Sequence, residues 1–375
     1  MPGLRPDVDP NGLQEFSVVF TDRSVNHMSQ KFQTAMRDIS AMLGDVYKAH
    51  AVAIVPGGGT YAMEAAARQF TAGKHALIVR NGWFSFRWTQ IFDMGGFAAK
   101  STVVMARQSG NAARSPYAPP PIAEVVAKIR AEKPDVVFAP HVETSAGLIL
   151  PDSYITAMAA AAHEVGALMI LDCIASGAIW VDMQKTGVDV LISAPQKGWS
   201  ASPSAGLVML SKRAAERLDQ TTSNSFALDL KKWRAIMAAF EGGGHAYHAT
   251  MPTDALLGFR DAMVETQTIG FETLKDAQWA LGKGVRAMLA AKGVAPVAAE
   301  GFGAPGVVVS YTDDPEIQNG KKFLGAGLQI AAGVPLQVGE GAEFKTFRIG
   351  LFGLDKLTNV EATLARLKIA VDQVL

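Results

Sequence analysis

An aspartate and a lysine stand at the ends of two successive apolar runs near the middle of the chain. Asp172 follows the run 167–171, and Lys197 comes shortly after the run 188–192. A lysine that closes a buried strand is poorly solvated, and such an amine commonly holds a carbonyl cofactor as a Schiff base. A carboxylate from a neighbouring strand is the usual partner of a pyridinium nitrogen. The pair suggests pyridoxal phosphate, and the alternative is a surface lysine beside a helix-capping aspartate.

A glycine-rich loop provides a candidate phosphate site. Pro56-Gly57-Gly58-Gly59-Thr60 follows the apolar run 51–55 and leads into a predicted helix. Glycines that run into the start of a helix leave backbone N–H groups free to bind a phosphate. The loop lacks the Gly-Lys-Ser/Thr ending of a Walker A sequence. A tight turn without a ligand is the alternative.

Two further strand ends carry groups suited to a flat ring. The run 75–79 is followed by Trp83 and Phe84, which are able to stack on a ring or to join the core. The run 135–139 leads into hydroxyl side chains at 144–145, which are able to bond a phenolic oxygen or to cap a helix. Ligands of doubly wound sheets bind beyond the carboxyl ends of the strands. We therefore expect the five strand ends to form one site.

Short apolar runs alternate with helical stretches between residues 51 and 217. We predict strands near 51–55, 75–79, 99–105, 135–139, 167–171, 188–192 and 206–211. The helices between them are predicted near 61–72, 85–93, 121–132, 152–165 and 212–217. This alternation predicts an α/β fold, with a mainly parallel seven-stranded sheet and helices on both of its faces.

The pattern changes at both ends of this region. A helical face is predicted over 28–48, and 106–120 is predicted to be a loop. A long helix near 270–292, strands near 306–311 and 345–350, and a last helix near 357–374 predict a smaller C-terminal α+β domain. We expect three parts: an N-terminal arm over 1–25, a large cofactor-binding domain over 26–265 and a small domain over 266–375.

Composition narrows the class of protein. Lys plus Arg and Asp plus Glu number 35 each, so no global charge attracts nucleic acid or an anionic membrane. The single Cys173 excludes an internal disulfide framework and a cysteine-based zinc site, and no metal site is predicted. The first residues do not form a secretory signal, and no segment is apolar enough to span a bilayer. We expect a cytoplasmic enzyme.

Together these motifs resemble the class V aminotransferases of fold-type I, the group that holds the alanine–glyoxylate, serine–glyoxylate and phosphoserine enzymes. The resemblance runs from about Asn26 to Leu351 and implies pyridoxal phosphate as cofactor. Phe84 matches the family's stacking aromatic, with Trp83 as the fallback. Thr144 or Ser145 matches the residue at the ring oxygen. The resemblance implies these cofactor-binding residues: Gly58, Gly59, Thr60, Phe84, Thr144, Ser145, Asp172, Gln196 and Lys197.

Two motifs of the C-terminal half add a partner subunit and a substrate site. Tyr247 and Thr250 match the family's Y-x-x-T, which the second subunit donates to the phosphate. The resemblance therefore implies a homodimer with active sites at the interface. Arg348 matches the arginine of R-I-G, which binds the substrate carboxylate in the family. A planar guanidinium suits that role.

The resemblance implies transamination between a small amino acid and an oxo acid such as glyoxylate or pyruvate. Lys197 forms the internal aldimine and carries the proton, and Asp172 keeps the ring nitrogen protonated. Phosphoserine is disfavoured as substrate, because Met28 replaces the arginine of an H-R-S segment. His27 in that segment lines the substrate pocket or caps a helix.

Other activities are weighed against this one. A desulfurase needs a reactive cysteine on a mobile loop, and Cys173 lies in a predicted buried turn. Other lyase chemistry on the same cofactor stays open. A dinucleotide-binding oxidoreductase would use the loop 57–59, where Ala62 stands in place of the third fingerprint glycine. The missing glycine weakens that alternative, and the alternative stays open because the fingerprint also accepts alanine at this position.

Overall fold

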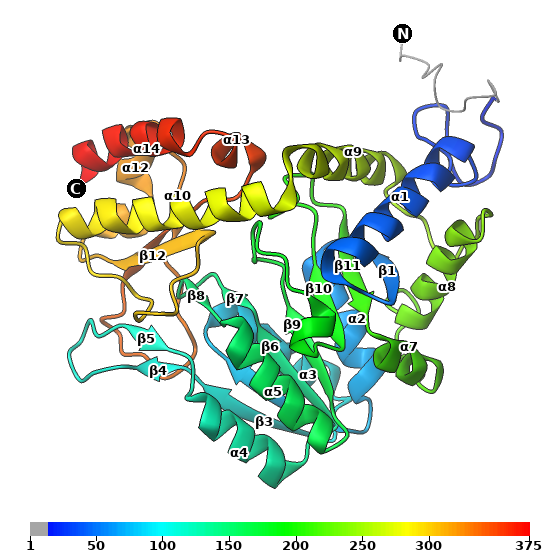
Figure 1. Cartoon of the computed structure of the whole chain (residues 1–375), viewed down its shortest axis with the longest axis horizontal. Coiled ribbons are helices and arrows are strands. Elements are labelled where there is room, and N and C mark those ends of the chain that lie inside the picture. The colour runs from blue at the N-terminus through cyan, green and yellow to red at the C-terminus, as the bar shows by residue number, and fades with distance from the viewer. Residues whose placement is uncertain (1–13) are drawn as a thin grey trace.

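The computed structural model describes residues 14–375, and a seven-stranded sheet forms the centre of that part of the chain (Figure 1). Residues 1–13 of the predicted N-terminal arm lie outside the described residues. The strands are β1 (Ala51–Pro56), β2 (His75–Arg80), β3 (Lys100–Met105), β6 (Val136–Pro140), β9 (Leu168–Asp172), β10 (Val190–Ser193) and β11 (Ala205–Leu210).

The sheet has the strand order β1-β11-β10-β9-β6-β2-β3. β11 runs antiparallel to β1 and β10, and the other neighbouring pairs are parallel. The prediction of a mainly parallel seven-stranded sheet is confirmed.

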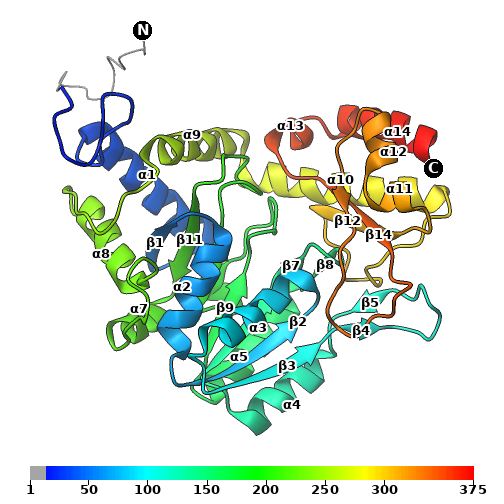
Figure 2. The same cartoon turned by 180° about the vertical axis from the view of Figure 1, so that it is seen from behind.

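Helices cover both faces of this sheet. α4 (Ile122–Glu132) and α5 (Asp152–Glu164) lie on the face nearer the viewer in Figure 1, and α2 (Gly59–Thr71) and α3 (Trp83–Gly95) lie on the face nearer the viewer in Figure 2. A strand covered on both sides needs apolar residues at consecutive positions. β9 has that pattern, since all five of its residues are buried.

More helices pack around the β1 edge of the sheet. They are α1 (Gln30–Tyr47), α7 (Lys212–Asp219), α8 (Leu230–Glu241) and α9 (Thr253–Ile269), and the short α6 (Met183–Thr186) precedes β10. α1 follows the predicted helical face, and the Ser29 hydroxyl caps it. No helix is predicted over 220–265. α8 nevertheless buries Leu230, Trp233 and Met237, so the helical spacing is present in the sequence.

A smaller α+β region follows Gly270, as predicted. α10 (Phe271–Ala291) and α14 (Val360–Val374) cover a three-stranded antiparallel sheet of order β12-β14-β13. Its other elements are β12 (Val307–Tyr311), β13 (Ala331–Ala332), β14 (Thr346–Gly350), α11 (Pro315–Gln318), α12 (Lys321–Gly325) and α13 (Leu354–Leu357). Residues of α10, β12, β14 and α14 form a hydrophobic cluster of their own.

The loop predicted over 106–120 is wrong in part. β4 (Arg107–Gln108) and β5 (Tyr117–Ala118) pair there as a short hairpin. Two-residue strands leave no periodic pattern in the sequence, so only tertiary contacts reveal them. The same holds for the pair β7 (Val142–Glu143) and β8 (Leu148–Ile149). Across residues 14–375, the structure contains no helix with the length and apolar character needed to cross a membrane.

Candidate active site

A cavity of about 420 Å³ lies between the carboxyl ends of the central strands and the small sheet. Eight of the residues predicted for the site line it: Gly59, Thr60, Phe84, Thr144, Asp172, Gln196, Lys197 and Arg348. Arg87, Ile174 and Phe352 also line the wall. The structure thus brings together predicted site residues that are up to 289 positions apart in the chain (348 − 59).

The start of α2 faces this cavity through Gly59 and Thr60. Gly58 is the N-cap residue, and no side chain caps the helix. The first N–H groups of a helix have no partner inside it, and they lie at the positive end of the helix dipole. A side chain at position 59 would collide with Ile174. This corner therefore suits an anionic group such as a phosphate.

Asp172 is the last residue of β9 and is buried. One carboxylate oxygen accepts a hydrogen bond of 2.9 Å from the Ile174 backbone N–H. Burial, with a smaller contribution from the charge of Glu143, raises the pKa of Asp172 to about 7 against the opposing effects of the Ile174 bond and Arg87. A cation held against this carboxylate would favour its charged form. A protonated ring nitrogen fits that requirement.

Lys197 lies in the loop between β10 and β11, with its Nζ 5.1 Å from the centre of the Phe352 ring. Burial lowers the pKa of Lys197, and the charges of Arg348 and Arg87 lower it further. A lower pKa increases the fraction of neutral amine, which is the nucleophilic form. The next residue is Gly198, where a side chain would collide with the Gly177 backbone. Close packing therefore fixes the loop beside the lysine.

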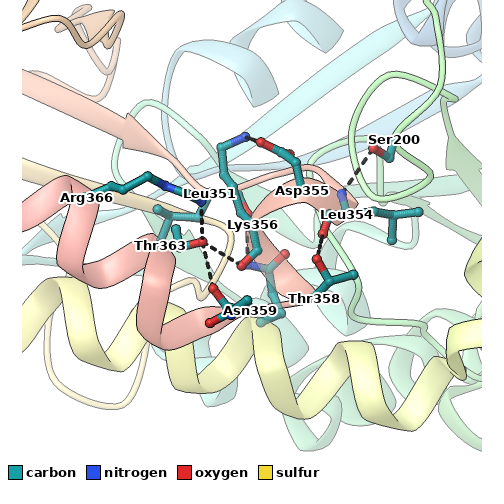
Figure 3. Close-up of polar contacts among 10 residues, drawn as sticks. Ser200, Leu351, Leu354, Asp355, Lys356, Thr358, Asn359, Thr363 and Arg366 are labelled. Carbon is teal, nitrogen blue, oxygen red and sulfur yellow. Dashed lines mark hydrogen bonds and ion pairs between the residues drawn. The ribbon is translucent and has the colours of Figure 1, made fainter.

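The lysine loop is tied to the segment that follows β14 (Figure 3). The Ser200 hydroxyl accepts a hydrogen bond of 3.1 Å from the Leu354 N–H. Leu354 in turn accepts from the Thr358 hydroxyl, and the Thr363 hydroxyl donates to the carbonyl oxygens of Lys356 and Asn359. These bonds connect the loop of the lysine with the part of the chain that carries the cavity arginine.

A buried carboxylate holds the start of α3. Glu143 accepts hydrogen bonds from the N–H groups of Phe84 (3.1 Å) and Ser85 (2.9 Å) and from the Ser85 hydroxyl (2.7 Å). The Ser145 hydroxyl donates to Glu143 at 2.7 Å and accepts from the Trp83 N–H at 2.9 Å. Glu143 thereby positions the helix turn that carries Phe84. The sequence prediction gives it no role.

The structure places the members of two pairs of candidates differently, Thr144 and Ser145 in one pair and Phe84 and Trp83 in the other. Thr144 lines the cavity, whereas the Ser145 hydroxyl is buried in the network around Glu143. Phe84 lines the cavity and Trp83 does not. The Phe84 ring centre is 4.7 Å from the Arg87 Cζ and 5.6 Å from the Arg348 Cζ.

His27, Tyr247 and Thr250 are not among the residues that line the cavity. The Tyr247 and Thr250 hydroxyls are 3.1 Å apart, and Tyr247 is half exposed. The His27 ring centre lies 5.5 Å from that of Tyr247. The helix-capping alternative for His27 is wrong, because Ser29 caps α1. The three residues form a second group on this subunit.

The cavity has the donors and acceptors that pyridoxal phosphate needs. The start of α2 lacks a side-chain cap, and the buried Oε1 of Gln196 has no hydrogen-bond partner among the described residues. Burial raises the pKa of Cys173 well above its ordinary value, as expected for an inert thiol. Over residues 14–375, no three His, Cys, Asp or Glu side chains are placed to hold a metal ion.

Residues 14–299 match the family described as aminotransferase class V. The chain belongs to the class V aminotransferases. It is a pyridoxal-phosphate-dependent aminotransferase, which confirms the resemblance and excludes the dinucleotide-binding oxidoreductase.

The individual relatives are distant. The chain is 26% identical to a 2-aminoethylphosphonate–pyruvate transaminase of Burkholderia ambifaria, over 84% of this chain and 80% of that protein. It is 27% identical to a protein of Synechococcus sp. named soluble hydrogenase, small subunit, over 92% and 88% of the two chains. The structure of an alanine–glyoxylate aminotransferase from Nostoc sp. is 23% identical, covers 94% of this chain and 89% of that one, and has a TM-score of 0.78.

The buried Asp172 makes the stability of the cofactor-free protein depend on pH. Its pKa of about 7 lies above the ordinary 3.8, so its charged form is unfavourable in the fold, and stability falls as pH rises from about 4 through 7. Asp172→Asn cannot ionise. In urea unfolding at pH 8, the free energy of unfolding of Asp172→Asn should exceed that of the wild type by up to about 4 kcal/mol. At pH 4 the two values should differ little. Equal gains at both pH values, or a gain for the exposed Asp261→Asn, would contradict this.

Glu143→Gln replaces an acceptor of five hydrogen bonds with a group that is partly a donor. The N–H groups at the start of α3 then lose partners while buried, so the free energy of unfolding should fall by about 2–4 kcal/mol. Glu124→Gln is the matched control, because Glu124 is in the first turn of α4 and pairs with Arg107 at the surface. It should change stability by about 0.5 kcal/mol or less. Equal effects of the two variants would refute the role of Glu143.

Proposed function

We propose that this enzyme transfers the amino group of a small amino acid to an oxo acid such as glyoxylate or pyruvate, and that Lys197 holds the cofactor. The observation that carries the proposal is the cavity shared by Lys197, Asp172 and Arg348, which come from three separate segments. The relatives named for pyruvate and for glyoxylate support the choice of acceptor.

Several residues are proposed to hold the cofactor. The N–H groups of Gly59 and Thr60 bind the phosphate, the Phe84 ring stacks on the pyridine ring, and Thr144 meets the ring oxygen. The Asp172 carboxylate pairs with the ring N–H, which offsets the cost of burying its charge. When bound, pyridoxal phosphate supplies the electron-accepting ring that makes the proton on the substrate α-carbon acidic.

Lys197 and Arg348 are proposed to act on the substrate. The Arg348 Nε already donates to the Ala332 carbonyl at 2.8 Å, so the side chain is held while its Nη groups can bind the substrate carboxylate. This contact with the carboxylate orients the α-carbon of the substrate toward Lys197. The Lys197 amine, whose pKa is lowered by burial, takes the α-proton as a general base and later donates it as an acid.

We also propose a two-fold dimer in which His27, Tyr247 and Thr250 of one subunit contribute to the site of the other. Tyr247 is half exposed and is hydrogen-bonded to Thr250, so the two hydroxyls can bind a phosphate together. His27 contacts Tyr247 and would reach the same site. The cytoplasmic location and the domain limits 26–265 and 266–375 remain predictions from the sequence.

Lys197→Ala should abolish both turnover and the visible absorbance at roughly 410–430 nm that a lysine-bound cofactor gives. The loss follows from the missing amine, so it should occur even when circular dichroism shows an intact fold. Lys185→Ala, which removes a lysine from the short α6, is the control and should keep both signals. A Lys197→Ala protein that retains the absorbance and the turnover would show that another group holds the cofactor.

Mixing two defective variants tests the shared site. Lys197→Ala lacks the lysine, and the double variant Tyr247→Ala/Thr250→Ala lacks the donated hydroxyls. After subunit exchange at equal amounts, half of the dimers are mixed and each has one intact site, so about a quarter of wild-type activity should return. Sedimentation should give a dimer. A monomer with full cofactor affinity, or no recovery in a mixture shown to exchange subunits, would rule out the arrangement.

A further inference from the structure

Arg87 is a cavity residue to which neither the sequence prediction nor the proposed function gives a role. It lies on α3 one turn after Phe84, so both side chains are on one face of the helix. The Arg87 Nη1 donates a hydrogen bond of 3.1 Å to the Thr60 hydroxyl, and its Cζ is 4.7 Å from the centre of the Phe84 ring. These contacts hold the guanidinium beside the start of α2.

The charge of Arg87 is not balanced by an ion pair. Within residues 14–375 no carboxylate lies within ion-pair distance of it, although it is near enough to Asp172 to lower the pKa of that group. The start of α2 is the positive end of a helix dipole and repels a second cation. A guanidinium held there is stabilised when an anion binds between it and the helix N–H groups.

Two anions need places in this cavity, the cofactor phosphate and the substrate carboxylate. Arg348 enters from β14 of the small sheet, whereas Arg87 adjoins the start of α2. The Thr60 hydroxyl accepts from Arg87, which leaves its own O–H free to donate to a neighbouring oxygen. We propose that Arg87 binds the cofactor phosphate together with Thr60 and the start of α2. This inference rests on the proposed function, in which the cofactor occupies this cavity.

A phosphate ester carries about −1.5 to −2 charges at neutral pH, more than the start of one helix neutralises. Arg87 supplies a full positive charge from the same subunit as Lys197. The phosphate therefore has a charged partner that does not depend on the second subunit. Removal of the Arg87 guanidinium should therefore weaken binding of the phosphorylated cofactor far more than binding of the unphosphorylated ring.

The test compares two probes on the cofactor-free dimer, pyridoxal phosphate and pyridoxal, titrated by absorbance. Arg87→Gln should weaken the affinity for pyridoxal phosphate by about 10- to 100-fold and change the affinity for pyridoxal much less. Arg87→Lys keeps the charge without the planar fork and should recover part of the loss. Inorganic phosphate should compete with pyridoxal phosphate less well in Arg87→Gln than in the wild type.

Arg80→Gln is the matched control. Arg80 also stacks on an aromatic ring, that of Phe86 at 4.6 Å, and donates to a threonine hydroxyl, that of Thr89 at 2.8 Å, but it does not line the cavity. It should keep the wild-type ratio of the two affinities.

Three outcomes would overturn the proposal for Arg87. Equal losses for both probes would mean that Arg87 supports the Phe84 ring. If Arg87→Gln kept the wild-type ratio of the two affinities and had a higher KM for substrates with a second acidic group, Arg87 would bind the substrate instead. If Arg80→Gln lost affinity for pyridoxal phosphate relative to pyridoxal to the same extent, the effect would come from the net charge of the protein and not from Arg87. A wild-type protein that binds neither probe would contradict the proposed function itself.

Discussion

The parallel alignment of β2, β6, β9 and β10 is the constraint on which the site depends. Parallel strands end at the same edge of a sheet, so residues that follow them meet even when they are far apart in the chain. The register pairs Asp172 with Ile192 of β10 and with Pro140 of β6, so the carboxylate lies between the lysine loop and the segment that carries Glu143 and Thr144. The antiparallel β11 then returns the chain from the lysine loop into the sheet. The helices on both faces keep this edge fixed.

Burial gives the two proposed catalytic groups opposite pKa shifts. It raises the pKa of Asp172 to about 7 and lowers the pKa of Lys197, so the charged form of each is disfavoured in the cofactor-free cavity. A bound cofactor with a ring cation and an anionic phosphate would compensate these costs. Binding to the folded state alone also stabilises that state by mass action. The charges of the cavity residues are therefore compensated only when the cofactor is bound.

Much of this arrangement could be predicted from the sequence. The strands of the central sheet are continuous apolar runs, and the predicted site residues at or after their ends include seven that line the cavity. The eighth, Arg348, lies in β14 of the small sheet. Glu143 and Arg87 could not be assigned in this way. Glu143 acts through hydrogen bonds to backbone groups some 60 positions earlier, and Arg87 becomes a cavity residue only because α3 begins at Trp83. Short strands such as β4 and β7 depend on tertiary contacts and leave no periodic signal.

The edge of the sheet is proposed to bring Lys197 to the cofactor as its covalent partner. Reduction of the wild-type protein with borohydride converts a lysine–cofactor bond into a stable secondary amine, and digestion with mass spectrometry then locates the label. We expect one modified peptide, the one that contains Lys197, and no labelling of that peptide when the cofactor is removed first. A label on a different lysine, or none on a protein that absorbs light as a cofactor complex, would show that Lys197 is not the covalent partner.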